Sequence, residues 1–192
     1  MGKIAALLLI AAVAPAQAAK YDIDAAHSSV AFKIRHFVGQ VQGSFNEFSG
    51  SFEFDAKAPA KASVDAVIKT ASVDTRNEGR DKHLRGEDFF EVEKFPEMTF
   101  KGDKLTVGKG KGQYKLSGTL ALHGVEKPVT LAVSFGGELK DAKGKMHAGF
   151  TASGTINRKD FGIVFNKTLD NGGLMLGEDV AVDIEVEGVQ AQ

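Results

Sequence analysis

The sequence predicts an all-β protein whose strands form a closed antiparallel barrel of about eight strands. Apolar and polar residues alternate in many short segments, a pattern typical of strands with one buried face. The segments between them are short and contain Gly, Lys and Asp, as antiparallel hairpins do, whereas parallel crossovers need about a dozen residues or more. A barrel also removes the exposed edges of an open sheet. A sandwich of two sheets is the alternative architecture.

The alternation is clearest at 48–54, where Phe48, Phe52 and Phe54 share one face and polar side chains occupy the other. At 30–36 the apolar face ends in His36. Further strands are expected at 64–69, 97–105, 114–123, 129–135, 147–156 and 180–186, with a weaker one at 163–165. The expected turns are 108–112, 123–128 and 141–145. Alternation fixes which residues share a face but leaves open which face is inside.

One segment, 72–100, interrupts the strands. Its first half has charged residues at helical spacing, with Leu84 as a single apolar anchor, and its second half is rich in phenylalanine. We expect a short polar helix followed by an aromatic loop, which either plugs one end of the barrel or forms a gate to its interior. Arg80, paired with Asp81 or with another carboxylate, is expected to hold this helix on the barrel rim.

The N-terminus has the features of a secretory signal peptide. Lys3 precedes an uncharged apolar run at 4–13, and 16–18 (AQA) provides small residues for cleavage. This run is well short of the roughly 20 residues that a membrane-spanning helix needs, so we expect no retained membrane anchor. The expected organisation is a signal peptide at 1–18 and a single barrel domain at 19–192.

The composition excludes several classes of function. The formal net charge of −1 argues against a nucleic-acid partner. Because the chain has no cysteine, disulfides, thiol catalysis and lipid attachment to an N-terminal cysteine are excluded. The chain contains 14 Phe, 2 Tyr and no Trp, and Phe brings no polar group that a buried site must satisfy. An ordinary sheet core and a dry interior for a hydrocarbon ligand both explain this balance.

Catalytic and metal-binding motifs are not apparent in the sequence. The five histidines are far apart, and none has a second His or Cys at a metal-ligand spacing. The acidic residues at 87–93 alternate with apolar ones and are interpreted as a solvated loop face. His36 is the polar residue of most interest, because its imidazole could hydrogen-bond a ligand head group. A core histidine satisfied by the backbone is the competing interpretation.

A set of linked motifs resembles the YceI family of bacterial periplasmic proteins. The motifs cover the predicted barrel domain in the family's order: FKIRH at 32–36, GSFNEFSG at 43–50, SVDT at 72–75, RDKHL at 80–84, DFF at 88–90, FPEMTF at 95–100, LALHGVEKPVTL at 120–131 and EGV at 187–189. The resemblance implies a lipocalin-like barrel that takes a polyisoprenoid chain, such as an octaprenyl quinone or an octaprenyl phosphate lipid. It also implies a periplasmic location, a link to stress response, and no catalysis or cofactor other than the bound lipid.

Two other functions stay open: a secreted enzyme acting on a hydrophobic substrate, and a ligand-free barrel that serves as an interaction module. The expected partners are the lipid itself and, transiently, a membrane or membrane protein, for a monomer or a homodimer. The residues expected to bind the lipid are Phe32, Ile34, His36, Phe45, Phe48, Phe52, Phe54, Phe89, Phe90, Phe95, Phe100, Leu120, Leu122, Phe150, Phe161 and Phe165. We expect Phe89, Phe90 and Phe95 to form its gate or rim.

Overall fold

The computed structural model describes residues 18–168 and 174–191, so the expected signal peptide lies outside the described residues except for Ala18. The strands are β1 (Ala19–Ile23), β2 (Ser29–His36), β3 (Gly39–Phe45), β4 (Phe48–Phe54), β5 (Ser63–Lys69), β6 (Val73–Asp74), β7 (Glu97–Val107), β8 (Gln113–Leu122), β9 (Val125–Lys140), β10 (Met146–Asn157) and β11 (Leu176–Gln190). The helices are η1 (Ala25–His27), η2 (Pro59–Lys61), η3 (Thr70–Ser72), α1 (Glu78–Arg85) and η4 (Arg158–Phe161).

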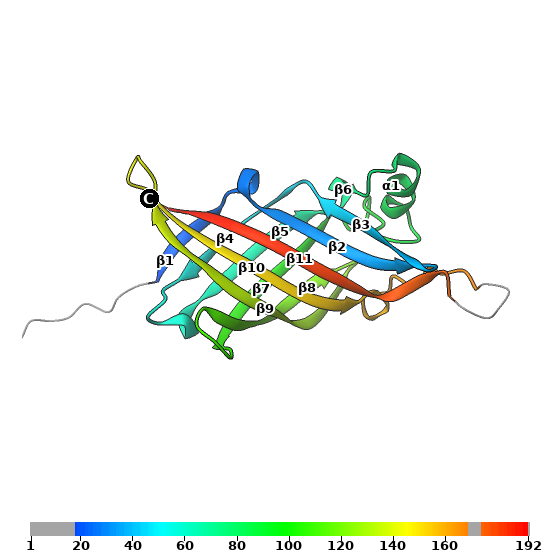
Figure 1. Cartoon of the computed structure of the whole chain (residues 1–192). Helices are drawn as coiled ribbons and strands as arrows, with labels where there is room; N and C mark the ends of the chain where they lie inside the picture. The colour runs from blue at the N-terminus through cyan, green and yellow to red at the C-terminus, as the bar shows by residue number, and fades with distance from the viewer. Residues whose placement is uncertain (1–17, 169–173, 192) are drawn as a thin grey trace, which may run out of the picture.

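The sheet closes on itself as an antiparallel barrel (Figure 1). Its strands follow the order β1-β4-β5-β7-β8-β9-β10-β11, and β11 pairs with β1 again. The second edge of β11 pairs first with β2 and then with β1, so these two segments form one strand path interrupted by η1. In the same way β3 continues into β4, and β5 continues into β6. The expected closed barrel of eight strands is therefore confirmed, and the two-sheet alternative is wrong.

The structure corrects some of the expected boundaries. β9 already begins at Val125, so the expected turn at 123–128 consists of His123 and Gly124 alone. Both residues have positive φ, 52° and 75°, as a two-residue hairpin turn requires. The weak strand expected at 163–165 does not form, because this segment follows η4 irregularly and buries Ile163. β1, which carries Lys20 and Asp22, and β3, which is rich in glutamine and glycine, were not expected.

Two apolar clusters fill the two ends of the barrel. One gathers residues beneath α1 and its following loop, such as Phe45, Phe89 and Leu122; we call this end the α1 end. At the other end, Phe52, Phe54, Phe135 and Phe150 pack edge-on or tilted against one another, with ring centroids 4.9–5.4 Å apart; we call it the aromatic end. Aromatic pairs at this spacing stabilise a core beyond the area that they bury. The aromatic end is therefore tightly packed.

The helix α1 is held on the barrel by hydrogen bonds rather than by a large apolar face. Asn77 caps it by accepting from the backbone N–H of Arg80 at 2.9 Å. Arg85 donates to the carbonyl oxygens of Ala71 and Val73, both at 2.7 Å.

Among the described residues, no helix is long and apolar enough to cross a membrane.

Candidate binding cavity

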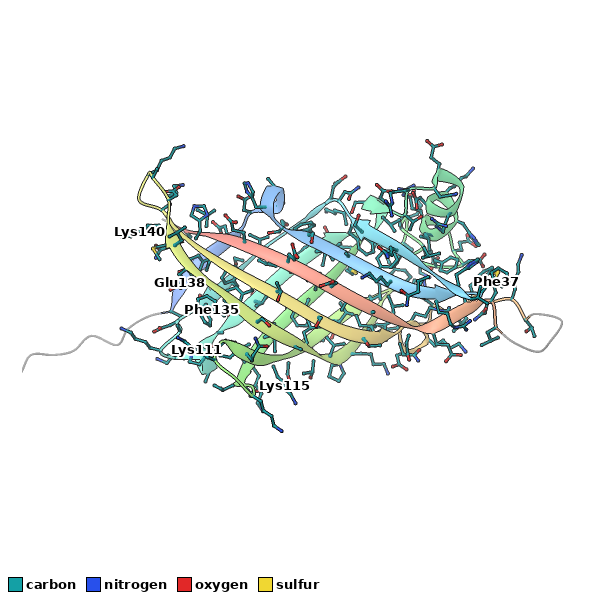
Figure 2. The ribbon with its side chains drawn as sticks, in the orientation of Figure 1. Phe37, Lys111, Lys115, Phe135, Glu138 and Lys140 are labelled. Atoms are coloured by element: carbon teal, nitrogen blue, oxygen red, sulfur yellow. The ribbon has the colours of Figure 1, made fainter. Side chains whose placement is uncertain are left out.

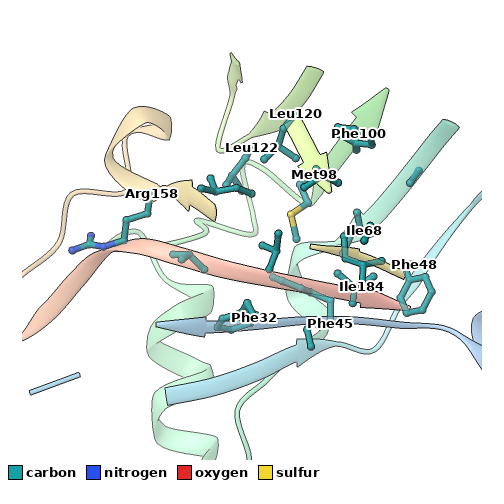
Figure 3. Close-up of a pocket in the computed structure, with 18 of the residues that line it drawn as sticks. Phe32, Phe45, Phe48, Ile68, Met98, Phe100, Leu120, Leu122, Arg158 and Ile184 are labelled. Carbon is teal, nitrogen blue, oxygen red and sulfur yellow. The ribbon is translucent and has the colours of Figure 1, made fainter. Parts of the chain in front are cut away.

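The barrel encloses a cavity of about 530 Å³ whose wall is almost entirely apolar (Figure 3). The wall is made by strand residues that alternate with outward-facing polar ones, as a barrel interior requires. On β11, for example, Val180, Val182, Ile184 and Val186 line the cavity, while the residues between them point outward. The volume lies within the range of about 300–1,000 Å³ typical of small-molecule sites.

The wall contains most of the residues that the sequence singled out for lipid binding. These are Phe32, Ile34, His36, Phe45, Phe48, Phe52, Phe54, Phe89, Phe90, Phe100, Leu120, Leu122, Phe150 and Phe165. The residues that the period-2 patterns at 30–36 and 48–54 grouped on one apolar face therefore line the cavity together.

Phe95 and Phe161 do not line the cavity, which corrects two of the expected positions. Phe161 is 2% exposed and packs in the cluster at the α1 end, behind the wall. Phe95 stacks on His123 with ring centroids 4.7 Å apart, and the Lys94 ammonium lies 5.0 Å from its ring. Of the three residues expected at the gate or rim, Phe89 and Phe90 line the cavity and Phe95 does not. In loops and short helices, no alternation pattern shows the direction of a side chain.

Other wall residues were not anticipated. They include Ala66, whose small side chain leaves room inside the barrel, and the larger Met98 and Leu131. The strands containing them were expected, but their inner faces were not assigned. Glycines also let strands approach closely: a Cβ at Gly118 would lie 2.3 Å from the Lys101 carbonyl oxygen.

An aromatic group closes part of the α1 end. The His83 ring contacts those of Phe89 and Phe165 edge-on, with both centroid distances 5.0 Å, and these two phenylalanines lie 5.1 Å apart. His83 also shares a 2.8 Å hydrogen bond with Asp88. The three rings connect α1, the loop after it and the segment after η4.

Arg80 and Asp81 are not directly paired, which corrects the expected rim contact. Both bind Thr75: the Arg80 Nε donates to its hydroxyl at 2.7 Å, and Asp81 accepts from its backbone N–H and hydroxyl. Asp81 is 6% exposed and Thr75 is 4% exposed. The network fastens the start of α1 to the end of β6, which is the structural role expected for Asp81.

The basic side chains of the wall are concentrated at the α1 end. His36, Arg80, His83, Arg158 and Lys167 come from β2, α1 and the region from η4 to 167. Glu53 on β4 also borders the cavity, but its side chain lies on the exposed face of the strand. Arg158, which the sequence did not single out, is 4% exposed, and burial lowers the pKa of its guanidinium. The cavity therefore has an apolar body and one positively charged end.

A second polar cluster lies outside the cavity, near η1. His27 shares a 2.8 Å hydrogen bond with Asp24, and His147 shares one of 2.8 Å with Glu187. The ligand atoms of Asp24, His27 and Glu187 lie within 4.8 Å of one another. These histidines are 120 positions apart in the printed sequence, so ligand spacing could not reveal the cluster. The cluster joins η1, which lies between β1 and β2, to β10 and β11.

Comparisons with known proteins match this architecture to one family. The family model of the YceI-like domain matches residues 21–188, which is nearly all of the barrel. The chain belongs to the YceI family. A UPF0312 protein of Yersinia pestis (strain Pestoides F) is similar to it, at 43% identity over 190 residues, covering 98% of this chain and 95% of that protein.

Solved structures show the same fold as this YceI chain. The Campylobacter jejuni YCEI protein is 36% identical, with a TM-score of 0.68, covering 79% of this chain and 86% of that one. A polyisoprenoid binding domain from Saccharophagus degradans superposes with a TM-score of 0.61 at 18% identity, covering 91% of this chain and 99% of that one. Because this domain is only 18% identical, the comparison with it supports the fold alone.

Proposed function

We propose that this YceI protein binds a polyisoprenoid or a similar long-chain amphiphilic lipid inside the barrel and that it performs no catalysis. The observation that carries the proposal is the apolar cavity of about 530 Å³, lined by aromatic and aliphatic side chains from every part of the barrel. Such a wall stabilises a hydrocarbon chain by removing it from water and offers few groups that could react with it. The Saccharophagus domain of the same fold, described as polyisoprenoid-binding, supports the choice of ligand class.

The magnitude of burial favours a carrier or store over an irreversible binder. At about 0.8 kcal/mol per buried CH₂, eight isoprene units would give roughly 30 kcal/mol, beyond the roughly 18–21 kcal/mol at which non-covalent affinities saturate. A lipid taken from a membrane also leaves a hydrocarbon environment, so its net gain on transfer is much smaller. Modest net affinity suits exchange of the lipid between the barrel and a membrane or a membrane protein.

We place this exchange at the α1 end and the protein in the periplasm after export. The tip of the β2–β3 hairpin carries Phe37, which is 46% exposed, and Val38, which is fully exposed. The Phe37 N–H donates to the Met175 carbonyl at 2.9 Å, and Met175 lines the cavity. Figure 2 places Phe37 at the opposite end of the barrel from Glu138 and Lys140. Exposed apolar side chains beside a cavity opening suit insertion into a lipid surface.

The test is organic extraction of the protein purified without detergent, followed by mass spectrometry of the extract. We expect a long-chain lipid in near-stoichiometric amount. Ala152→Trp places a bulky side chain in the cavity and should remove the lipid. Ala132→Trp makes the same change at an exposed position of β9 and should retain it. Because the chain has no other Trp, fluorescence also reports the surroundings of each new indole. An empty barrel in the wild type, or equal lipid in both variants, would contradict the proposal.

A further inference from the structure

Arg158 is a buried cation in the cavity wall whose hydrogen bonds go to neutral groups. Its Nε donates to the Gly177 carbonyl at 2.8 Å and its Nη1 to the Ile163 carbonyl at 2.7 Å. Among the described residues, its Nη2 is buried without any hydrogen-bond partner. A guanidinium keeps its charge in proteins, so the wall holds a permanent positive charge at this point.

No carboxylate in the described part of the chain contacts this guanidinium. Glu178 lies close enough to influence it, but the Glu178 carboxylate accepts from the Lys159 ammonium at 2.5 Å. Burying a charge is costly unless it is paired, and an unpaired buried N–H adds a further cost. An anion at this end of the cavity would reduce the cost of the unpaired charge.

The charge of Arg158 lies at one end of the cavity and not at its centre. Figure 3 shows Arg158 at one side, apart from the labelled apolar side chains, with its guanidinium extending away from them. Arg80 and Lys167 also line the wall at the α1 end, whereas the aromatic end gathers apolar side chains such as Phe52 and Phe54. An amphiphile with a negative head group would therefore be favoured in one orientation, with its head at the α1 end and its chain toward the aromatic end.

We propose that the cavity selects amphiphiles with an anionic head group, a phosphate monoester or a carboxylate, and that Arg158 is the residue that attracts it. The inference rests on the proposed lipid-binding function and specifies the ligand class of the same cavity. Hydrogen bonds between a guanidinium and such oxyanions are short and about twice as strong as neutral ones. A lipid with a neutral head group would leave the buried charge uncompensated.

The test compares three probes of equal chain length. Dodecyl phosphate, dodecanol and dodecylammonium, each below its critical micelle concentration, displace the fluorophore N-phenyl-1-naphthylamine from the delipidated full chain. We expect the phosphate to bind about tenfold or more tightly than the alcohol, and the ammonium to bind more weakly than both. Arg158→Gln should reduce the preference for the phosphate to within about twofold and leave the dodecanol affinity nearly unchanged.

Arg35→Gln is the matched control. Arg35 also donates to a carbonyl at the α1 end, that of Leu174 at 3.3 Å, but it does not line the cavity, so its loss should preserve the preference. Equal wild-type affinities for the phosphate and the alcohol would overturn the inference while the lipid-binding function stands. Failure of all three probes to displace the fluorophore would overturn both. Displacement by millimolar inorganic phosphate alone would identify a free-anion site and overturn the amphiphile assignment. If Arg158→Gln does not fold, the wild-type ratios still decide.

Discussion

Asp81 and Thr75 are joined by two hydrogen bonds that end on the same carboxylate oxygen. The Thr75 backbone N–H donates to Asp81 Oδ1 at 2.9 Å, and the Thr75 hydroxyl donates to it at 2.5 Å. Because both residues are buried, no water can replace either bond. The contact ties α1 to the barrel wall beside the proposed opening.

Replacing Asp81 should therefore destabilise the fold. Asp81→Ala leaves the N–H and hydroxyl of Thr75 buried without their acceptor, and hydrogen bonds to charged groups contribute about 1.5–3 kcal/mol. We expect the free energy of unfolding to fall by about 3 kcal/mol, measured by urea denaturation. Glu78→Ala removes an exposed carboxylate from the same helix and should change it by less than about 0.5 kcal/mol. Equal effects of the two changes would contradict the assigned role of Asp81.

A substitution at His36 tests the role of a polar group in the cavity wall independently of Arg158. It lines the cavity at the end of β2, where its ring meets that of Phe37 edge-on at 4.5 Å. His36→Leu would remove the expected hydrogen bond to the lipid head group, worth on the order of 1 kcal/mol. Calorimetric titration should show less than about tenfold weaker binding of a lipid with a polar head and unchanged binding of a hydrocarbon of equal length. Equal losses for both ligands would mean that His36 supports the barrel and does not contact the head group.

The hairpin tip should control the rate of lipid transfer. Substituting serine for both Phe37 and Val38 removes exposed apolar surface without touching most of the wall, so transfer of a fluorescent lipid to vesicles should slow severalfold. Equilibrium affinity for a short soluble ligand should stay the same. Val107→Ser is the control, because Val107 is 72% exposed on β7, in the strand half that packs toward the aromatic end. If the control slows transfer as much as the tip variant does, the opening lies elsewhere.

The cluster near η1 should make stability depend on pH. Its hydrogen bond to Glu187 raises the pKa of His147 above 6.5, and the bond to Asp24 raises the pKa of His27. Hydrogen bonds from Lys145 and His147 lower the pKa of Asp141 below 3.8. Because the two histidine pKa values are higher in the folded protein, the protonated histidines stabilise the fold. This stabilisation is complete below about pH 6.5 and is lost as the pH rises through the histidine pKa values of the folded protein. The ionised Asp141 carboxylate stabilises the fold above about pH 3.8. This stabilisation is lost as the pH falls through the carboxyl pKa of the folded protein.

Urea midpoints of the wild type should therefore decrease from pH 6 to pH 8.5. The His147→Gln variant should show a smaller decrease, because only His27 then contributes. The two proteins should be closest in stability at the alkaline end of the range. A larger difference at pH 8.5 than at pH 6 would have the wrong sign for this explanation.

The barrel could be predicted from the sequence because most strands show the alternation of apolar and polar residues within their own segment. At 48–54 and 30–36, alternation grouped Phe52 with Phe54 and Phe32 with Ile34 on one face, and in the structure these faces line the cavity. The irregular segments were not predictable in this way: Phe95 and Phe161 are as apolar as the wall residues, but their directions depend on the tertiary packing around His123 and η4.

The charge at the α1 end was also hidden in the sequence. Arg158 stands in a polar run after β10, where an arginine is usually solvent-exposed. Its burial follows from η4 turning back under β11, so that the Gly177 carbonyl accepts from its guanidinium. His27 and His147 likewise meet only because β10 and the β1–β2 path both pair with β11. Contacts of this kind depend on the strand order of the barrel, which alternation does not encode.

The central claim is that the barrel interior binds a hydrocarbon chain, and the dependence of affinity on chain length tests it most directly. The delipidated protein is titrated with geraniol, farnesol and geranylgeraniol, which differ by one isoprene unit each and share one head group. At about 0.8 kcal/mol per buried CH₂, we expect affinity to rise at least tenfold with each added unit until the cavity is filled. Affinities that are independent of chain length, or no binding of any of the three alcohols, would contradict the account.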